Sequence, residues 1–141
     1  MASDGRVDPA TTTEDVLTRQ QRVARSVLVV DDDAAVLSVV SRMLRRAGGE
    51  VTSAASGRDA LQLIAGGRVN PGILLTDIDM PGMSGIELAA RVAALRPGTR
   101  IVMMTGDPAS AEAARQHVGM VEAVLLKPIT GDELAQAIGW P

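Results

Sequence analysis

Residues 26–33 read SVLVVDDD, an apolar run that ends in three consecutive aspartates. The run 27–30 is apolar and mostly β-branched, which is typical of a parallel strand buried on both faces. Carboxylates that directly follow such a strand lie at its carboxyl end. The stretch therefore predicts an α/β sheet with acidic groups gathered at one edge.

The rest of the chain alternates apolar runs with amphipathic segments. The expected strands cover residues 26–30, 50–54, 72–76, 100–104 and 123–126, and the expected helices cover residues 33–46, 57–65, 85–95, 109–118 and 132–138. This alternation requires a parallel sheet with helices on both faces. Because crossovers are right-handed, we expect a doubly wound, flavodoxin-like α/β fold with five parallel strands in the order 2-1-3-4-5.

The first 25 residues differ from this pattern because they are polar and lack a regular apolar period. Thr11 and Glu14 fit a capping box for a short helix near residues 14–24. We therefore expect residues 1–25 to be a polar tail or linker, with or without that helix, and residues 26–139 to form one domain.

Composition excludes several classes of function. The chain has 141 residues, no cysteine, one aromatic residue (Trp140) and a net charge of −3. Disulfides, thiol catalysis, zinc–thiolate sites and iron–sulfur clusters are excluded, and the charge and missing aromatics argue against a nucleic-acid partner. With no bilayer-length apolar run and no signal-peptide stretch, we expect a cytoplasmic protein without a membrane partner, either a monomer or a weak homodimer.

The basic residues are strongly biased toward arginine, since Lys127 is the only lysine among 14 basic side chains. Lysine carries a compact point charge on a thin stem, whereas arginine is a broad planar fork. The bias suggests a role for Lys127 that arginine cannot fill, although a lone lysine also arises by chance.

Polar residues follow four of the five expected strands. They are Asp31, Asp32, Asp33, Asp77, Asp79, Thr105 and Lys127. Ligands of open α/β sheets bind at the carboxyl ends of the strands where the strand order reverses, here between strands 1 and 3. We expect Asp33 to cap the following helix and the others to form a site.

Electrostatics indicates what such a site binds. Two carboxylates ~4 Å apart at an effective dielectric constant of ~20 repel each other by ~4 kcal/mol, so a cluster of them recruits protons or a cation. Oxygen ligands without nearby histidine or cysteine favour Mg²⁺, or Mn²⁺ in its place. Lys127 and Thr105 beside the metal would complete a phosphoryl-binding pocket, with Asp77 as the best candidate for a carboxylate nucleophile.

These residues resemble the receiver domains of bacterial response regulators, of either the single-domain or the hybrid-kinase-appended type. The resemblance rests on residues 27–33 (VLVVDDD), 73–85 (ILLTDIDMPGMSG), 101–106 (IVMMTG) and 126–128 (LKP), and it extends over residues 26–139. It implies a signalling phosphoprotein of a two-component phosphorelay rather than an enzyme. The partner would be a histidine kinase or a histidine phosphotransfer protein.

The same resemblance implies a role for each matching residue. Asp77 would accept the phosphoryl group, and the phosphoaspartate would decay by hydrolysis. Asp32 and Asp77 would bind Mg²⁺ through their carboxylates, Asp79 through its backbone carbonyl, and Asp31 through a metal-bound water. The phosphoryl-binding and switch residues would be Thr105, Gly106 and Lys127.

The chain departs from the family pattern at the switch. Receivers usually carry Tyr or Phe three residues before the lysine, where this chain has Val124. Our hypothesis is that backbone movement of loop 105–110 carries the output instead, and superimposable loops with and without a phosphoryl mimic would contradict it. Asp79 and Asp107 beside the acceptor would either repel an attacking hydroxide or orient an attacking water.

A phosphohydrolase of the haloacid dehalogenase type is the alternative interpretation, because those enzymes use an aspartyl nucleophile with a second aspartate two residues later, as in Asp77 and Asp79. Their motif follows the first strand, however, and here it follows the third. A scaffold independent of phosphorylation is less favoured still, since it has no need for a costly acidic cluster.

Overall fold

The computed structural model describes residues 13–140 of the chain. These residues form a five-stranded parallel sheet in the order β2-β1-β3-β4-β5, which confirms the predicted topology. The strands are β1 (Ser26–Val30), β2 (Glu50–Ala54), β3 (Ile73–Asp77), β4 (Arg100–Thr105) and β5 (Ala123–Leu126).

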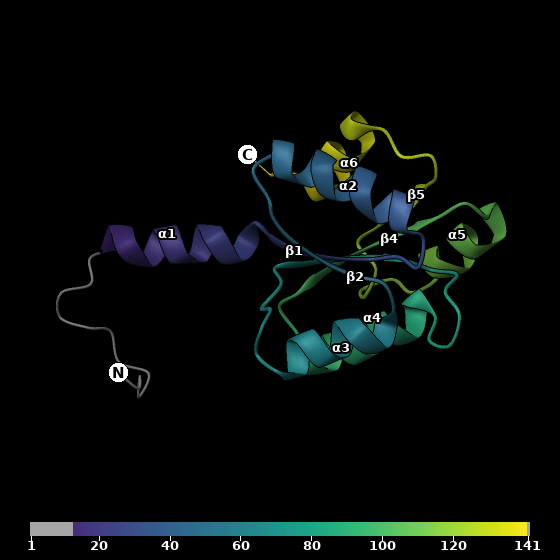
Figure 1. The fold of residues 1–141 in the computed structure, drawn as a ribbon, viewed down its shortest axis with the longest axis horizontal. Coiled ribbons are helices and arrows are strands. Elements are labelled where there is room, and N and C mark those ends of the chain that lie inside the picture. Colours follow the sequence, from purple (N-terminus) through teal and green to yellow (C-terminus); the bar gives the residue numbers. More distant parts are fainter. Residues whose placement is uncertain (1–12, 141) are drawn as a thin grey trace.

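Helices cover both faces of this sheet (Figure 1). The helices are α1 (Thr13–Ala24), α2 (Ala34–Arg46), α3 (Gly57–Ala65), α4 (Gly85–Leu95), α5 (Pro108–Arg115) and α6 (Gly131–Ile138). One apolar cluster joins the sheet to α2 and α6, and a second joins it to α3, α4 and α5. The three inner strands β1, β3 and β4 are therefore almost entirely buried, and their polar groups reach solvent at the strand ends.

Strand β1 shows why this arrangement is stable. Its side chains Val27 and Val29 pack in the cluster with α2 and α6, and Leu28 and Val30 pack in the opposite cluster. All four are fully buried. Full burial of such a side chain contributes about 1.5–3 kcal/mol. Burial of these side chains therefore holds β1 at an inner position of the sheet. This position determines where Asp31 and Asp32 lie at the carboxyl end of the strand.

Two strands and three helices differ slightly from their predicted bounds, and for α2 and α6 the difference is one residue at the start. Strand β3 extends to Asp77, which pairs with Met104, and β4 extends to Thr105, which pairs with Leu126. Helix α5 begins at Pro108 because Asp107 caps it, and it ends at Arg115 rather than at residue 118. Pairing with a neighbouring strand, which local sequence does not reveal, extends both strands into the polar residues.

The short helix near residues 14–24 is present as α1, which extends away from the sheet (Figure 1). The predicted capping residue Thr11 lies outside the described residues. At the other end of α1, the Trp140 indole nitrogen donates to the carbonyl of Ala24 (3.1 Å), and the Arg25 guanidinium lies 5.3 Å from the Trp140 ring centroid. Within residues 13–140, no helix has both the length and the apolar character needed to cross a bilayer.

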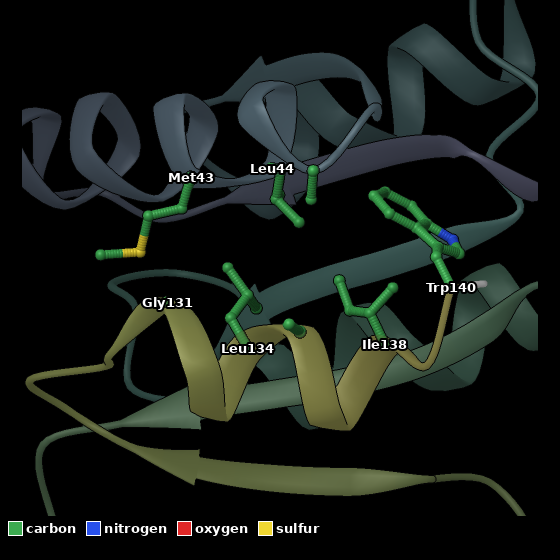
Figure 2. A pocket seen from close by; sticks show the side chains of 8 residues that line it. Met43, Leu44, Gly131, Leu134, Ile138 and Trp140 are labelled. Atoms are coloured by element: carbon green, nitrogen blue, oxygen red, sulfur yellow. The ribbon is translucent and has the colours of Figure 1, made fainter.

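A small apolar cavity of about 80 Å³ lies between α2 and α6, with the ring of Trp140 at one end (Figure 2). Leu44, Leu134 and Ile138 contribute to its wall, and the other lining residues are likewise apolar or glycine. It offers no titratable group and no metal ligand, so the chemistry of the fold lies elsewhere.

Close packing between α4 and the end of β3 depends on a glycine. A Cβ atom at Gly85 would overlap the carbonyl oxygen of Asp77 and lie 2.9 Å from the Cα of Ile78. The Gly85 amide donates to the carbonyl of Ile78 at 2.8 Å, which draws the first turn of α4 against the strand end. The absence of a side chain at residue 85 thus sets the position of Asp77.

We expect Gly85→Ala to lower the free energy of unfolding by about 2 kcal/mol, because the added methyl group has only backbone to displace. Chemical denaturation would measure the change. Gly98→Ala is the matched control, since a Cβ there meets nothing within 4 Å, and we expect a change within about 0.5 kcal/mol. Equal stability of the two variants would contradict this account of the packing.

Candidate functional site

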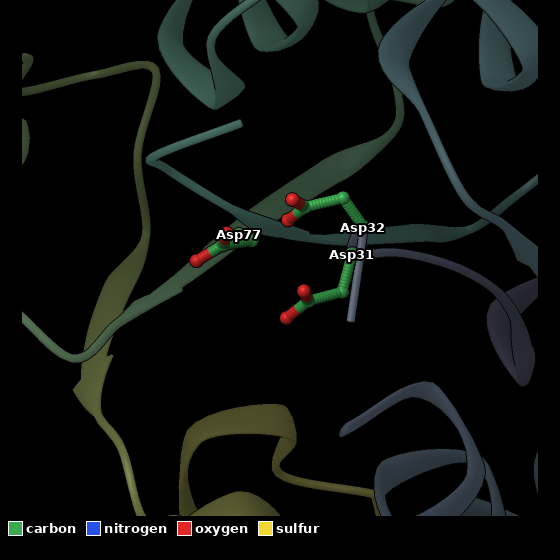
Figure 3. Close-up of side chains that lie close together, drawn as sticks. All are labelled: Asp31, Asp32 and Asp77. Carbon is green, nitrogen blue, oxygen red and sulfur yellow. The ribbon is translucent and has the colours of Figure 1, made fainter. Parts of the chain in front are cut away.

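Three aspartates meet at the carboxyl ends of β1 and β3. Asp31 and Asp32 follow β1, Asp77 ends β3, and one carboxylate oxygen of each lies within 4.8 Å of those of the other two (Figure 3). Asp31 and Asp77 are 0% and 5% exposed, whereas Asp32 is exposed to solvent. Two of the three charges are thus removed from water and need compensation within the protein.

Lys127 provides that compensation from the loop after β5. Its Nζ atom lies 2.7 Å from Oδ2 of Asp31 and 3.1 Å from Oδ1 of Asp77. The Lys127 amide also donates to the Thr105 carbonyl at 2.8 Å, which anchors the loop at the end of β4. One ammonium therefore bridges two strand ends that are 46 residues apart in the sequence.

The burial of these groups changes their proton affinities. Burial, above all, raises the pKa of the Asp77 carboxyl; the hydrogen bond from Lys127 acts in the opposite direction, and the charge of Asp31 adds to the rise. Burial by itself lowers the pKa of the Lys127 ammonium, but hydrogen bonds to Asp31 and Asp77 outweigh it, so that this pKa is raised overall. Ionised Asp77 is therefore costly to the fold, and Lys127 stays charged.

Asp33 has the local role expected from the sequence. Its carboxylate accepts hydrogen bonds from the amides of Ala35 and Val36, at 2.9 and 3.3 Å, and so caps α2. The Asp33 amide in turn donates to Oδ1 of Asp31 at 2.9 Å. The cap thus orients one of the clustered carboxylates without joining the cluster.

Asp79 belongs to a second polar group beside the first. Its Oδ2 accepts a hydrogen bond from the Thr105 hydroxyl at 2.8 Å, and its Oδ1 accepts one from the Ser110 hydroxyl at 2.9 Å. Thr105 is fully buried, and its oxygen also accepts from the Asp107 amide at 3.0 Å. The Thr105 hydroxyl is therefore directed at Asp79 in this structure.

Ser110 is a site residue that inspection of the sequence missed. It lies in the first turn of α5, three residues after the capping Asp107, and its hydroxyl is 3.3 Å from Oδ2 of Asp107. The only sequence signal for Ser110 is that a hydroxyl follows Thr105 and Asp107 within a few residues. This signal is weak, because serine is favoured at helix N-termini for local capping alone.

The remaining predicted switch residues lie nearby. Val124 is half-buried and packs against the apolar cluster of α3, α4 and α5. Gly106 is exposed, and a Cβ there would meet nothing within 4 Å. The Val124 position thus holds a small aliphatic side chain in the core, with no ring that could turn inward or outward.

The donor set suits a hard divalent cation. Carboxylate oxygens from Asp31, Asp32 and Asp77 are the kind of ligand that Mg²⁺ prefers, and the exposure of Asp32 leaves the cluster open to solvent, where such an ion keeps several waters. The Asp79 side chain does not belong to this set; the sequence implied only a backbone carbonyl ligand from that residue.

Comparisons with known proteins agree with this geometry. A family model described as the response regulator receiver domain matches residues 27–139. The chain is 35% identical over 115 residues to the two-component response regulator ARR11 of Arabidopsis thaliana, an alignment that covers 79% of this chain and 21% of that protein. It is 30% identical over 111 residues to the transcriptional regulatory protein GlrR of Escherichia coli, with 79% of this chain and 24% of that protein covered. The chain thus spans about a quarter or less of the length of these relatives.

The alignment of this chain with solved structures of similar fold covers nearly the whole length of those structures. The chemotaxis response regulator CheY4 of Vibrio cholerae superposes with a TM-score of 0.69 at 30% identity, over 81% of this chain and 95% of that chain. The response regulator TrrA of Thermotoga maritima, solved in complex with Mg²⁺–BeF, gives a TM-score of 0.70 at 26% identity, over 82% of this chain and 96% of that chain.

Proposed function

Since this chain belongs to the response regulator receiver family, we propose that it is a phosphoacceptor of a two-component phosphorelay in which Asp77 receives the phosphoryl group. The observation that carries the proposal is the buried Asp77 carboxylate, held 3.1 Å from Lys127 and grouped with Asp31 and Asp32. A receiver acts as a signalling domain. The chemistry we propose is limited to its own phosphorylation and dephosphorylation.

In the proposed reaction, the phosphoryl group passes from the nitrogen of a phosphohistidine to an oxygen of Asp77. The N–P bond breaks, an O–P bond forms, and an acyl phosphate results. Water later attacks the phosphorus, which releases inorganic phosphate and restores the carboxylate. The donor would be a histidine kinase or a histidine phosphotransfer protein, and the reaction would take place in the cytoplasm.

The protein's part in phosphoryl transfer is mainly to position groups and to neutralise charge. Lys127 already contacts Asp77 and would pair with the transferred group as a point donor. Asp32 and Asp77 would hold Mg²⁺ through their carboxylates and Asp79 through its backbone carbonyl, with Asp31 acting through a metal-bound water. The ion would supply positive charge to neutralise the phosphoryl group. Thr105 and Gly106 would take part in phosphoryl binding, with the Thr105 hydroxyl donating to the bound phosphoryl group.

The phosphohydrolase alternative is not favoured. The family match and the fold both point to a receiver. In that alternative Asp79 would act on the leaving group beside Asp77, whereas its two carboxylate oxygens accept hydrogen bonds from Thr105 and Ser110.

We expect Mg²⁺ to raise the free energy of unfolding, by ~2.7 kcal/mol at a concentration about a hundredfold above its Kd, because it binds only the folded cluster. Thermal melts at increasing Mg²⁺ would measure this. Asp32→Asn should lose most of the gain. Asp33→Asn is the control and should keep it, since asparagine caps a helix as well as aspartate does. Equal losses in both variants would refute the assignment of Asp32.

We expect Asp77→Asn to abolish covalent labelling by acetyl phosphate while the protein remains folded. Its melting temperature without Mg²⁺ should equal or exceed the wild-type value at pH 7. The reason is that a raised carboxyl pKa makes ionisation of Asp77 lower the stability as the pH rises through that pKa. Mass spectrometry would detect the label.

Asp59→Asn, an exposed change on α3, serves as the control and should label normally. Labelling of Asp77→Asn at the wild-type rate would remove Asp77 from its role. Wild-type protein should stop near one phosphoryl group per chain; steady turnover of a small phosphate ester would favour the phosphohydrolase instead.

We expect Lys127→Arg to impair the phosphate-dependent response even though the charge is kept. The planar guanidinium does not fit where one Nζ reaches both Asp31 and Asp77. Labelling kinetics and amide shifts on addition of beryllofluoride would show the defect. Wild-type behaviour of this variant would mean that the lone lysine is a coincidence of composition.

A further inference from the structure

The Thr105 hydroxyl has one proton, and in this structure it donates that proton in a hydrogen bond to the Asp79 carboxylate. The Oγ1–Oδ2 distance is 2.8 Å, and Thr105 is fully buried. A hydroxyl donates one hydrogen bond at a time. While the bond to Asp79 persists, Thr105 therefore cannot donate to a phosphoryl group on Asp77.

The bond to Asp79 is also a strong one. The acceptor is a carboxylate, and hydrogen bonds to ionised acceptors are roughly twice as strong as neutral ones. The Asp107 amide donates to the same Thr105 oxygen at 3.0 Å, so that this oxygen is held from two sides. Breaking the arrangement needs an acceptor that competes with a carboxylate.

A second contact connects Asp79 to the first turn of α5. Oδ1 of Asp79 accepts from the Ser110 hydroxyl, and Asp107 caps the same helix through the Ala109 amide at 2.9 Å. One carboxylate thus joins the end of β4 to α5. Val124 supplies no ring that could carry a signal there, whereas these polar contacts form a continuous route from the site to α5.

We propose that Asp79 is a positioning residue that holds the Thr105 hydroxyl away from Asp77 until phosphorylation, and that release of Thr105 loosens the contact of Asp79 with Ser110 and so shifts the first turn of α5. The proposal rests on the proposed function of Asp77. A phosphoryl group brings up to two negative charges and three strong acceptor oxygens to the site. Its charge repels the Asp79 carboxylate, and its oxygens compete for the Thr105 proton.

The test is a titration with Mg²⁺ and beryllofluoride followed by amide NMR, combined with a double-mutant cycle. We expect Asp79→Ala to bind beryllofluoride about tenfold more tightly than wild type, the factor for a hydrogen bond of ~1.4 kcal/mol that no longer has to break. In the Thr105→Ala background the same Asp79→Ala change should have no effect, because there is no hydroxyl to release.

The Thr105→Ala background separates release of the Thr105 hydroxyl from simple removal of the negative charge of Asp79. Charge removal acts whether or not Thr105 is present, so a tenfold gain that persists in Thr105→Ala would overturn the proposal. Asp79→Asn keeps one acceptor oxygen and loses the charge. We expect it to lie between wild type and Asp79→Ala, and a gain as large as that of Asp79→Ala would also count against the proposal.

Ser110→Ala tests transmission to α5. We expect it to bind beryllofluoride more tightly than wild type, because binding no longer has to loosen the contact with Asp79, but to lose most of the ligand-induced shift of the Ala109 and Ala111 amides. Glu112→Gln, an exposed change on the same helix, is the matched control and should keep those shifts. Undiminished shifts in Ser110→Ala would overturn this part.

Failure of the proposed function gives a different result. If beryllofluoride does not bind wild-type protein, or binds Asp77→Asn equally well, then Asp77 is not the acceptor. If wild type binds normally and only the Thr105-dependent gain is missing, then Asp79 does not hold Thr105 and the phosphoacceptor assignment stands.

Discussion

The ion pairs of Lys127 with Asp31 and Asp77 are the interactions on which the site depends. Two carboxylates ~4 Å apart repel each other by ~4 kcal/mol at an effective dielectric constant of ~20, and Asp31 and Asp77 are both buried. The Lys127 Nζ atom lies 2.7 Å from Asp31 and 3.1 Å from Asp77, and its positive charge compensates much of that repulsion. The charge of the exposed Asp32 is not compensated by this lysine. The cluster is therefore assembled and stable, but it still carries excess negative charge that a cation would neutralise.

The fold places these groups through burial rather than through local contacts among them. The central strands β1 and β3 are buried on both faces, so their polar continuations have to emerge at the carboxyl edge. Lys127 reaches the same edge because β5 ends beside β4 and its amide bonds to Thr105. Gly85 adds a local condition, since only a residue without a side chain lets α4 pack against the Asp77 backbone.

The polar groups fall into two sets that meet at the end of β3. Asp31, Asp32, Asp77 and Lys127 form the set suited to a metal and a phosphoryl group. Asp79, Thr105, Asp107 and Ser110 form a neighbouring set that leads to α5. Thr105 is the residue that the two sets would share, and competition for its single proton would convert a change in charge at Asp77 into a change at α5.

The sequence alone determined the strand order, the edge at which the polar residues gather, and the capping role of Asp33, because apolar periodicity and parallel topology decide where each strand ends. It did not determine the final bounds of β3, β4 and three of the helices. Nor did it determine that the Asp79 carboxylate turns to Thr105 and Ser110, which are 26 and 31 residues away. A side chain's direction depends on which acceptors and donors surround it, and those neighbours are brought together only when the sheet and α5 pack.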